Sequence, residues 1–304
     1  MSFENGGQGM SVCQPQHQLQ LKVTAVPQVY MASSNEQRAK DAIERAEKDG
    51  REPGLGEIIW HPLDLKDPRD AKSSAEAFLK KESKLDILIN NAAMITDLGN
   101  PQKNVDGISE SMAINYLGPF VFTRTLLPLL ESTAATGDDV RIVNIGSDGH
   151  QKVSYFDYGS KEAWNHPFRW SLVPTLERYK YSKLAVHLWT NNLAQRLTTE
   201  NSKVFVVLVH PGAIMSDGAV NSLNTLPFPS FWVWLLNKSM HPQNQGAFAP
   251  VFAACAPRDD PQLFHGAYIL PPNVSAPQAK YAMDEGIQQQ LFAYTETLLK
   301  ELGV

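Results

Sequence analysis

The sequence predicts an α/β fold in which one domain forms a doubly wound parallel sheet, with a first βα unit that is atypical or absent. Short apolar runs alternate with longer segments of helical periodicity, and most of the runs are continuous rather than alternating. Continuous apolar strands joined through helices are typical of parallel sheets covered on both faces. At 304 residues with 43% hydrophobic content, the chain can bury the core of one large domain.

The first clear βα unit begins at residue 29. Residues 29–32 form a short apolar run that predicts a strand, and a capping signal then predicts a charged helix over about 34–48, closed by Gly50. Residues 57–65 predict a second strand that runs into a loop. Residues 68–81 have the spacing of an amphipathic helix.

The next three strands follow the same alternation. Residues 85–89 predict a strand, and a long helix over about 109–130 precedes another at 140–145. A helix that contains Tyr179 leads to a fifth strand at 203–209. We find no internal repeat and no linker between domains.

Polar residues follow the predicted strands at the points where the strands end. In a parallel sheet, ligands bind beyond the carboxyl ends of the strands. Four predicted strands end in this way, which predicts a binding site at the carboxyl ends of the strands. The residues are Asp64, Asn90 with Asn91, Ser147, and Pro211 with Gly212.

Tyr179 and Lys183 stand four residues apart, so a helix places both on one face. A free phenol has a pKa near about 10, and acid–base work near neutrality requires a lower value. An ammonium group about 4 Å away in a partly buried site could provide that lowering. Taken alone, the pattern also fits a surface lysine one turn from a packed tyrosine.

Composition argues against several function classes. The net charge of -5 provides no basic surface for nucleic acid. Cys13 and Cys255 are far apart and lack nearby histidines, which predicts no disulfide framework, no metal site and a reducing, cytoplasmic location. We expect no signal peptide in residues 1–20 and no membrane span. The aromatic stretch 226–236 predicts either a flap that covers substrate or touches a membrane, or ordinary core.

Five motifs, in this order and spacing, strongly resemble the short-chain dehydrogenase/reductase family. The resemblance covers residues 29–303 and implies a Rossmann fold. It is closest to the retinol-dehydrogenase-like and fungal secondary-metabolism branches. The motifs are Asn90-Asn91-Ala92-Ala93, Asn115 before Gly118, Gly146-Ser147, Tyr179-x-x-Ser182-Lys183 and His210-Pro211-Gly212.

The resemblance implies four catalytic residues. Tyr179 would be the general acid–base, and Lys183 would lower its pKa and bind the nicotinamide ribose. Ser147 would hold and polarise the substrate oxygen, although a serine in this setting also forms turns. Asn115 would hold a water that links Lys183 to solvent, or would simply distort a buried helix.

The resemblance also implies a nicotinamide cofactor, NADP with NAD as the alternative. Asp64 matches the position that receives the adenine, and Asn91 lets the backbone approach the ribose. Ile214 and Ser216 would lie near the carboxamide. Arg124 matches a basic position near the cofactor, although an exposed helix arginine fits the sequence equally well. Ser34 stands where relatives that prefer NADP carry arginine, which weakens that preference, and no acidic residue at the strand tip favours NAD.

The sequence departs from the family where the cofactor pyrophosphate should bind. The family begins with a strand and a glycine-rich turn, G-x-x-x-G-x-G, whose backbone amides hold the pyrophosphate. Residues 1–28 contain neither, so we treat them as an atypical N-terminal segment and 29–304 as the family-like domain. Without its first strand, which lies in the middle of the sheet, two neighbouring strands would have unpaired backbone groups. Residues 19–26 could form a strand that pairs with some of these groups. If residues 19–26 do not form such a strand, we expect the N-terminal segment to be disordered.

Two functions remain open at this point. The first is an NAD(P)-dependent oxidoreductase acting on an apolar ketone or secondary alcohol, with a role in secondary metabolism. The second is a catalytically impaired, cofactor-poor relative: a binding or scaffold protein, or a truncated gene product. Aromatic residues in 153–178 predict a substrate pocket or a packed insertion. Homo-oligomers are common among similar proteins.

Overall fold

The computed structural model describes residues 28–48, 56–95, 102–215, 230 and 240–304. The chain divides into two compact units, one comprising residues 1–31 and 36–60 and the other residues 32–35 and 61–304. The strand expected at 19–26 and the cofactor contact expected at Ser216 lie outside the described residues. So does the aromatic stretch 226–236, apart from Ser230.

The smaller unit contains the helix α1 (Glu36–Lys48) and most of the strands β1 (Gln28–Ser33) and β2 (Glu57–Pro62). The two strands pair in a two-stranded sheet. The helix carries Glu36 in its first turn and Lys48 in its last, which suits the helix dipole. These elements confirm the strand–helix–strand order predicted for residues 29–65, with β2 ending at Pro62.

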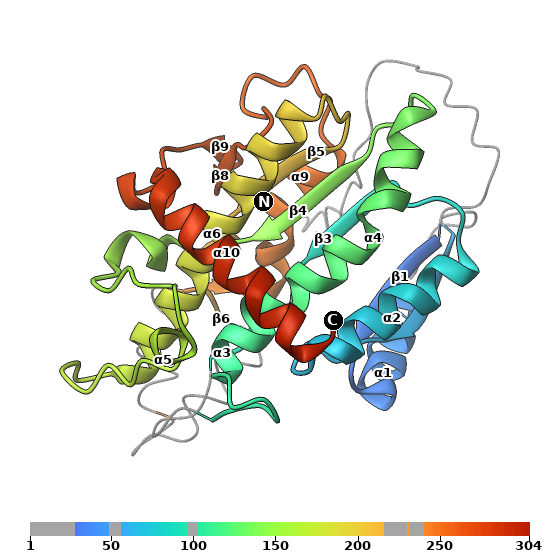
Figure 1. Ribbon diagram of the computed structural model, residues 1–304. Helices are drawn as coiled ribbons and strands as arrows, with labels where there is room; N and C mark the ends of the chain where they lie inside the picture. The colour runs from blue at the N-terminus through green and yellow to red at the C-terminus, as the bar shows by residue number, and fades with distance from the viewer. Residues whose placement is uncertain (1–27, 49–55, 96–101, 216–229, 231–239) are drawn as a thin grey trace, which may run out of the picture. The chain divides into compact units, whose positions relative to one another are not determined.

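The larger unit is built around a five-stranded sheet (Figure 1). Its strand order is β3-β4-β5-β8-β9, in which the first four strands run parallel and β9 is antiparallel. A separate parallel pair, β6 (Ile214–Met215) and β7 (His241–Pro242), follows β5 along the chain. The strands of the main sheet are β3 (Ile87–Asn90), β4 (Arg141–Ile145), β5 (Phe205–Val209), β8 (Tyr268–Leu270) and β9 (Val274–Ser275).

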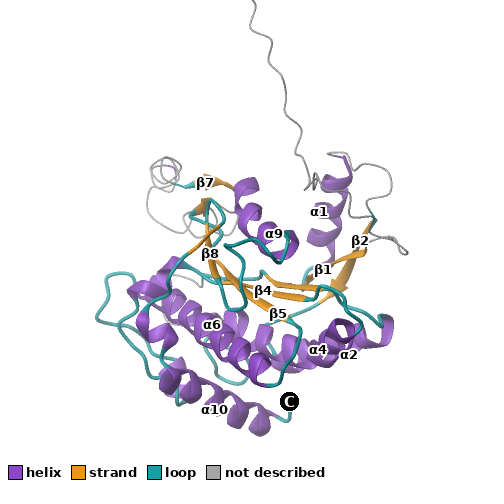
Figure 2. Cartoon of the chain, turned by 90° about the horizontal axis from the view of Figure 1, so that it is seen from above, coloured by secondary structure: helices purple, strands orange, loops and turns teal. Residues whose placement is uncertain are grey.

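Helices cover both faces of this sheet (Figure 2). One face carries α9, and the other carries α4 and α6, with α10 outside them. The helix expected at 109–130 consists of α3, a π-helical segment and α4. The helices of this unit are α2 (Pro68–Lys81), α3 (Glu110–Met112), α4 (Gly118–Ala135), α5 (Lys161–Trp164), α6 (Pro174–Thr199), α9 (Phe248–Cys255) and α10 (Glu285–Leu302). The layered, mainly parallel arrangement confirms the predicted Rossmann-type α/β class.

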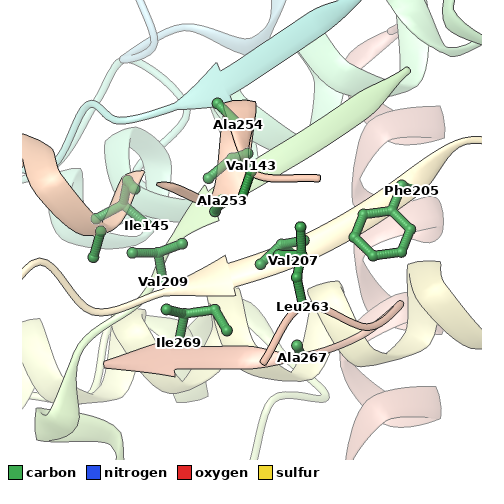
Figure 3. Close-up of a cluster of buried hydrophobic side chains, with 12 residues drawn as sticks. Val143, Ile145, Phe205, Val207, Val209, Ala253, Ala254, Leu263, Ala267 and Ile269 are labelled. Atoms are coloured by element: carbon green, nitrogen blue, oxygen red, sulfur yellow. The ribbon is translucent and has the colours of Figure 1, made fainter. Parts of the chain in front are cut away.

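The core between the sheet and α9 explains why β4 and β5 are continuous apolar runs (Figure 3). Every residue of both strands is buried. Small side chains, Ala249 and Ala253, face the strands from α9 and let the helix approach Val143 and Val207. Each valine buried in this way contributes about 1.5–3 kcal/mol. This packing holds the carboxyl ends of β4 and β5, where the predicted site residues lie.

β3 is an edge strand among the strands that the structure describes, because its one recorded neighbour is β4. Ile87 and Ile89 are 38% and 39% exposed, unusual for apolar residues of a strand in a covered parallel sheet. The described strands form three sheets rather than one. The expectation that the first βα unit is atypical or absent concerns residues before β1, which lie outside the described part of the chain, so it stays a prediction.

Candidate active site

Ser147 lies just beyond the carboxyl end of β4 and caps a 3₁₀-helix over Asp148–Lys152. Its hydroxyl oxygen accepts a hydrogen bond from the backbone N–H of Gly149 at 3.1 Å, so the serine does form a turn. The hydroxyl also donates a long hydrogen bond to Asp148 Oδ1, with 3.4 Å between the two oxygens. Ser147 is therefore fixed through its oxygen and can still donate its hydrogen to a better acceptor.

Tyr179 and Lys183 lie on α6 and reach the same place as Ser147. The Tyr179 and Ser147 side chains share a hydrogen bond. Lys183 Nζ donates to the carbonyl oxygen of Ile145 at 2.7 Å and lies 5.8 Å from the centroid of the Tyr179 ring. The structure thus brings together the three residues predicted to carry out the chemistry.

The pKa of Tyr179 does not shift in the direction expected from the sequence. Burial raises the pKa of the phenol, the hydrogen bond with Ser147 lowers it only in part, and the carboxylate of Asp148 raises it further. Lys183 cannot offset this, because burial also lowers its own pKa, to about 7. The expected lowering of the Tyr179 pKa is therefore wrong, because burial of the phenol raises this pKa more than the hydrogen bond with Ser147 lowers it.

Asn115 lies in the π-helical segment Ala113–Leu117. Its side-chain oxygen accepts the Met94 N–H at 2.7 Å, and its amide nitrogen donates to the Met94 carbonyl at 3.0 Å and to the Ser182 hydroxyl at 2.9 Å. The Ser182 hydroxyl donates to the carbonyl of Tyr179 at 2.8 Å. Asn115 therefore ties the segment after β3 to the helix of Tyr179, and π-helical turns of this kind are frequent at functional sites. Its water-holding role stays a prediction.

A chain of buried amide and hydroxyl groups fixes the spacing of the elements beneath the site. Asn90 at the end of β3 donates to Asn144 Oδ1 at 2.8 Å and to Thr123 Oγ1 at 2.9 Å. Asn144 in turn donates to Thr190 Oγ1 on α6 at 2.9 Å. Because buried polar groups without partners are costly, this network favours one alignment of β3, β4, α4 and α6.

The residues expected to bind the cofactor are less closely grouped. Asp64 is exposed after β2, where its carboxylate accepts the Lys66 backbone N–H at 2.9 Å. Asn91 is exposed after β3, and Ile214 begins β6. Arg124 forms an ion pair with Glu296 on α10 at 3.2 Å, so the structure does not bring it to the others. No cluster among the described residues has the His, Cys, Asp or Glu side chains to hold a metal ion.

Gly118 positions the loop that carries Asp64. A Cβ atom at this glycine would lie 2.4 Å from the carbonyl oxygen of Leu65. The start of α4 therefore packs directly against the backbone one residue after Asp64. This close approach explains why the Asn115 motif ends in glycine.

His210 and Asp148 lie beside the predicted catalytic residues, and the sequence alone assigned neither of them a role. His210 Nε2 lies 3.7 Å from Asp148 Oδ1, and its Nδ1 is buried without a hydrogen-bond partner among the described residues. Burial lowers the pKa of His210, while Asp148 raises it. His210 begins the His210-Pro211-Gly212 motif and Asp148 directly follows the Gly146-Ser147 motif, so the motifs were the sequence signal for both. Gly212, with φ of +95°, turns the chain after His210.

The aromatic residues of 153–178 mainly form a packed insertion. Tyr158, Trp164 and Phe168 are buried, and Tyr158 stacks on Tyr181 with ring centroids 4.3 Å apart. The Trp164 indole donates to the Tyr158 carbonyl at 3.0 Å. Trp170, in contrast, is 61% exposed. The alternative of an ordinary packed insertion is thus correct for these three buried rings.

A cavity of about 700 Å³ lies elsewhere, at the amino ends of β4 and β5. It is lined by Asp139, Lys203 and Arg258 among others. Asp139 is already paired with Arg141 and Arg258, at 2.5 and 2.7 Å. Ser147, which is predicted to be catalytic, lies beyond the opposite end of β4, so this cavity is separate from the predicted site.

Comparison with known proteins identifies the family of this chain. The family model for short chain dehydrogenases matches residues 20–164. A short-chain dehydrogenase/reductase of Armillaria gallica is 40% identical over 276 residues, which is 90% of this chain and 85% of the relative. The chain belongs to the short-chain dehydrogenase/reductase family. Human retinol dehydrogenase 14 is 29% identical over 286 residues, or 89% of this chain and 78% of that protein.

A solved structure supports the same fold for this family member. The NADPH-bound carbonyl reductase from chicken fatty liver aligns with a TM-score of 0.53 over 83% of this chain and 87% of that one, at 20% identity. As a member of the family, the protein is an NAD(P)-dependent oxidoreductase. Within the described parts of the chain, no helix is both long and apolar enough to cross a membrane.

Proposed function

We propose that the protein transfers a hydride between the nicotinamide of NADP and an apolar ketone or secondary alcohol, with NAD as the alternative cofactor. The observation that supports this most strongly is the convergence of Ser147, Tyr179 and Lys183 beyond the carboxyl end of β4. Ser147 supplies a hydroxyl donor, and α6 supplies the phenol of Tyr179 and the amine of Lys183, at least 32 residues later in the sequence.

The chain's own groups account for binding and protonation of the substrate oxygen. Ser147 donates a hydrogen bond to that oxygen, and the Gly149 N–H that binds the serine oxygen polarises the hydroxyl and strengthens this donation. Tyr179 transfers its proton to the same oxygen during reduction, or takes a proton from the alcohol during oxidation. Asn115 holds the helix of Tyr179 through Ser182.

Residues around β3 and α6 fit the nicotinamide-bearing half of the cofactor. A bound nicotinamide supplies or accepts the hydride. Asn91, Ala92 and Ala93 are exposed at the end of β3, which leaves backbone accessible to a ribose. Lys183 has three donor hydrogens and one recorded hydrogen bond, to Ile145, so it can also bind a ribose hydroxyl.

The remaining assignments depend on the family resemblance. We propose that Asp64 receives the adenine and that Ile214 and Ser216 contact the carboxamide. Arg124 stays a prediction that its pairing with Glu296 does not support. The sequence before β1 has no G-x-x-x-G-x-G pattern, and we assign no residue to the pyrophosphate.

We place NADP before NAD because of the residues at the end of β1. Ser33, Ser34 and Asn35 carry no carboxylate that would repel a 2′-phosphate. Ser34 is exposed and can donate a hydrogen bond to phosphate. No arginine stands at this position, so we expect a modest preference.

Exposed apolar residues before Tyr179 support an apolar substrate. Leu176 lies three residues before Tyr179, on the same side of α6, and is 41% exposed. Trp170, Leu172 and Val173 are also exposed in the preceding loop. An apolar ketone could contact this surface while its oxygen reaches Ser147.

Cofactor binding is the direct test of this proposal. NADPH at a hundredfold excess over its dissociation constant is expected to stabilise the full chain by about 2.7 kcal/mol, because it binds only the folded state. The measurement is a thermal shift with NADPH, NADH and adenosine as separate additions. Stabilisation should be larger for NADPH than for NADH and smallest for adenosine. Absence of any shift at millimolar NADPH would contradict the proposal.

A binding or scaffold role is the second candidate, and the exposed edge of β3 favours it. Ile87 and Ile89 lie on this strand, next to the segment that would contact the ribose. A screen of ketones and alcohols for cofactor consumption separates the candidates, since a scaffold would turn over none. Cytoplasmic location, homo-oligomer formation and a role in secondary metabolism stay predictions.

A further inference from the structure

Two buried histidines lie directly behind Ser147. His150 belongs to the 3₁₀-helix that Ser147 caps, and His187 follows Lys183 by four residues on α6. Their rings stack with centroids 3.7 Å apart and an interplanar angle of 18°. Both side chains have no exposed surface. His187 was not singled out from the sequence, and the feature that could have indicated it is its spacing of one helical turn from Lys183.

The two rings hydrogen-bond to the backbone of Ser147, one to its N–H group and the other to its carbonyl oxygen. The Ser147 N–H points at His187 Nε2, 3.4 Å away, and the Ser147 carbonyl oxygen lies 2.7 Å from His150 Nδ1. An N–H group can only donate, so His187 Nε2 must be the unprotonated nitrogen. A carbonyl oxygen can only accept, so His150 Nδ1 must carry a proton.

The outer nitrogens complete this assignment. His150 Nε2 lies 3.1 Å from the backbone N–H of Ala279 and must accept, while His187 Nδ1 lies 2.8 Å from Gln278 Oε1 and must donate. Gln278 is oriented by Asn191, whose side-chain oxygen accepts from Gln278 Nε2 at 2.9 Å. All four ring nitrogens are therefore used when both histidines are neutral and carry the proton on Nδ1.

The surroundings favour these neutral rings. Burial lowers the pKa of His187, the neighbouring His150 and Lys183 lower it further, and the Gln278 and Ser147 hydrogen bonds oppose this. Burial likewise lowers the pKa of His150, with Asp148 opposing and His210 adding to the effect. The Tyr268 ring of β8 packs edge-on against both histidines, at 4.9 Å from His187 and 5.3 Å from His150.

We propose that His187 is a positioning residue for the reaction, whose neutral imidazole, stacked on His150, holds the Ser147 backbone so that the serine hydroxyl faces Tyr179. This inference rests on the proposed function, in which Ser147 binds the substrate oxygen. Gly146 is part of the same arrangement, because a Cβ atom there would lie 2.6 Å from His187 Nε2. A misplacement of the hydroxyl by about 1 Å costs on the order of 10²-fold in rate.

Three variants test the role of His187 in turnover. His187→Phe keeps a ring stacked on His150 but removes the acceptor, and should lower kcat by about 10- to 100-fold with cofactor affinity unchanged. His187→Gln offers an amide oxygen as acceptor and should recover most of that loss. His265→Phe is the matched control, since His265 also faces a backbone N–H and a carbonyl, Val206 N at 3.3 Å and Ala194 O at 2.9 Å, at the far end of β5. It should keep kcat within about threefold while losing comparable hydrogen bonds.

The opposite results would overturn the proposal. Retention of kcat in His187→Phe, or an equal loss in His265→Phe, would mean that His187 does not position Ser147. If His187→Phe does not fold, the pH profile of His187→Gln decides. Burial lowers the pKa of His187, so we expect the acid limb of kcat in the wild-type chain to lie below pH 6.5 and to move to lower pH when this titrating ring is removed. An unchanged limb would contradict the assignment.

A second readout does not depend on turnover. Nitrogen chemical shifts of the histidine rings in the wild-type chain should show His150 and His187 neutral at pH 7, both with the proton on Nδ1, because burial lowers the pKa of each ring below 6.5. A proton on Nε2 of His187, or a charged ring at that pH, would overturn the inference. If the chain binds cofactor but reduces no substrate, the proposed function fails, while this spectrum still tests the histidine arrangement by itself.

Discussion

Replacing Tyr179 with phenylalanine is expected to lower kcat by about 10²–10⁴-fold, the usual contribution of a positioned general acid. The hydroxyl is the group that shares a hydrogen bond with Ser147, and phenylalanine keeps the ring that packs near Lys183. Cofactor affinity should change little, because only the proton-transfer group is lost. Steady-state kinetics together with a cofactor titration measure both quantities.

Tyr181→Phe is the matched control for this substitution. The Tyr181 hydroxyl donates to the Asp157 carbonyl at 2.5 Å, away from Ser147. Its loss should cost about 1 kcal/mol of stability and leave kcat within about threefold. If Tyr179→Phe retained most of the wild-type rate, the acid–base role would be wrong.

The raised pKa of Tyr179 favours reduction over oxidation near neutral pH. A phenol whose pKa lies above its ordinary value of 10.0 stays protonated throughout the neutral range. It is then ready to give a proton, as reduction requires, and poorly suited to take one. The rate of reduction by the wild-type chain should not change with pH through ionisation of Tyr179 near neutrality. The rate of oxidation, in contrast, should increase as the pH rises toward 10.

Replacing Lys183 with methionine is expected to abolish turnover and to stabilise the folded chain at the same time. Lys183 is 1% exposed, and its pKa falls from 10.5 to about 7 in the folded state. This shift lowers the free energy of unfolding by roughly 4 kcal/mol at pH 7, and the substitution by methionine removes this destabilisation. The lost hydrogen bond to the Ile145 carbonyl offsets about 1–2 kcal/mol, which leaves a net gain of about 2–3 kcal/mol.

The pH dependence of unfolding identifies the cause of this gain. Between pH 7 and 10.5 the unfolded chain binds more protons at Lys183 than the folded chain, so wild-type stability should fall as the pH drops through that window. Lys183→Met should lack this contribution. Lys180→Met is the control on the same helix, where loss of the ion pair with Glu177 at 2.8 Å should give no comparable gain. A lower free energy of unfolding for Lys183→Met at pH 7 would contradict the account.

Local sequence patterns predicted most of the fold. β4 and β5 are continuous apolar runs, and the structure buries all of their residues. α2 begins after the capping Asp67, whose carboxylate accepts a backbone N–H, and spans the predicted residues 68–81. These features depend on neighbours within a few residues, which a single sequence contains.

Features that depend on distant residues could not be predicted in the same way. The pKa of Tyr179 reflects burial by several elements, and the π-helical turn at Asn115 follows from its contacts with Met94 and Ser182. The His150–His187 stack joins residues on separate elements. For the same reason the sequence left open whether the aromatic residues of 153–178 form a pocket or a packed insertion. In the structure, Trp164 packs on Tyr116 with ring centroids 5.6 Å apart.

The central claim is that Ser147, Tyr179 and Lys183 support hydride transfer from a nicotinamide cofactor. The most direct measurement supplies NADPH carrying deuterium at the reactive carbon, together with a panel of apolar ketones, and analyses the alcohols by mass spectrometry. The account predicts alcohol with one deuterium on the carbinol carbon from the wild-type chain and none from Tyr179→Phe on the same timescale. NADPH that binds tightly while no ketone gains deuterium, or labelling that persists in Tyr179→Phe, would contradict it.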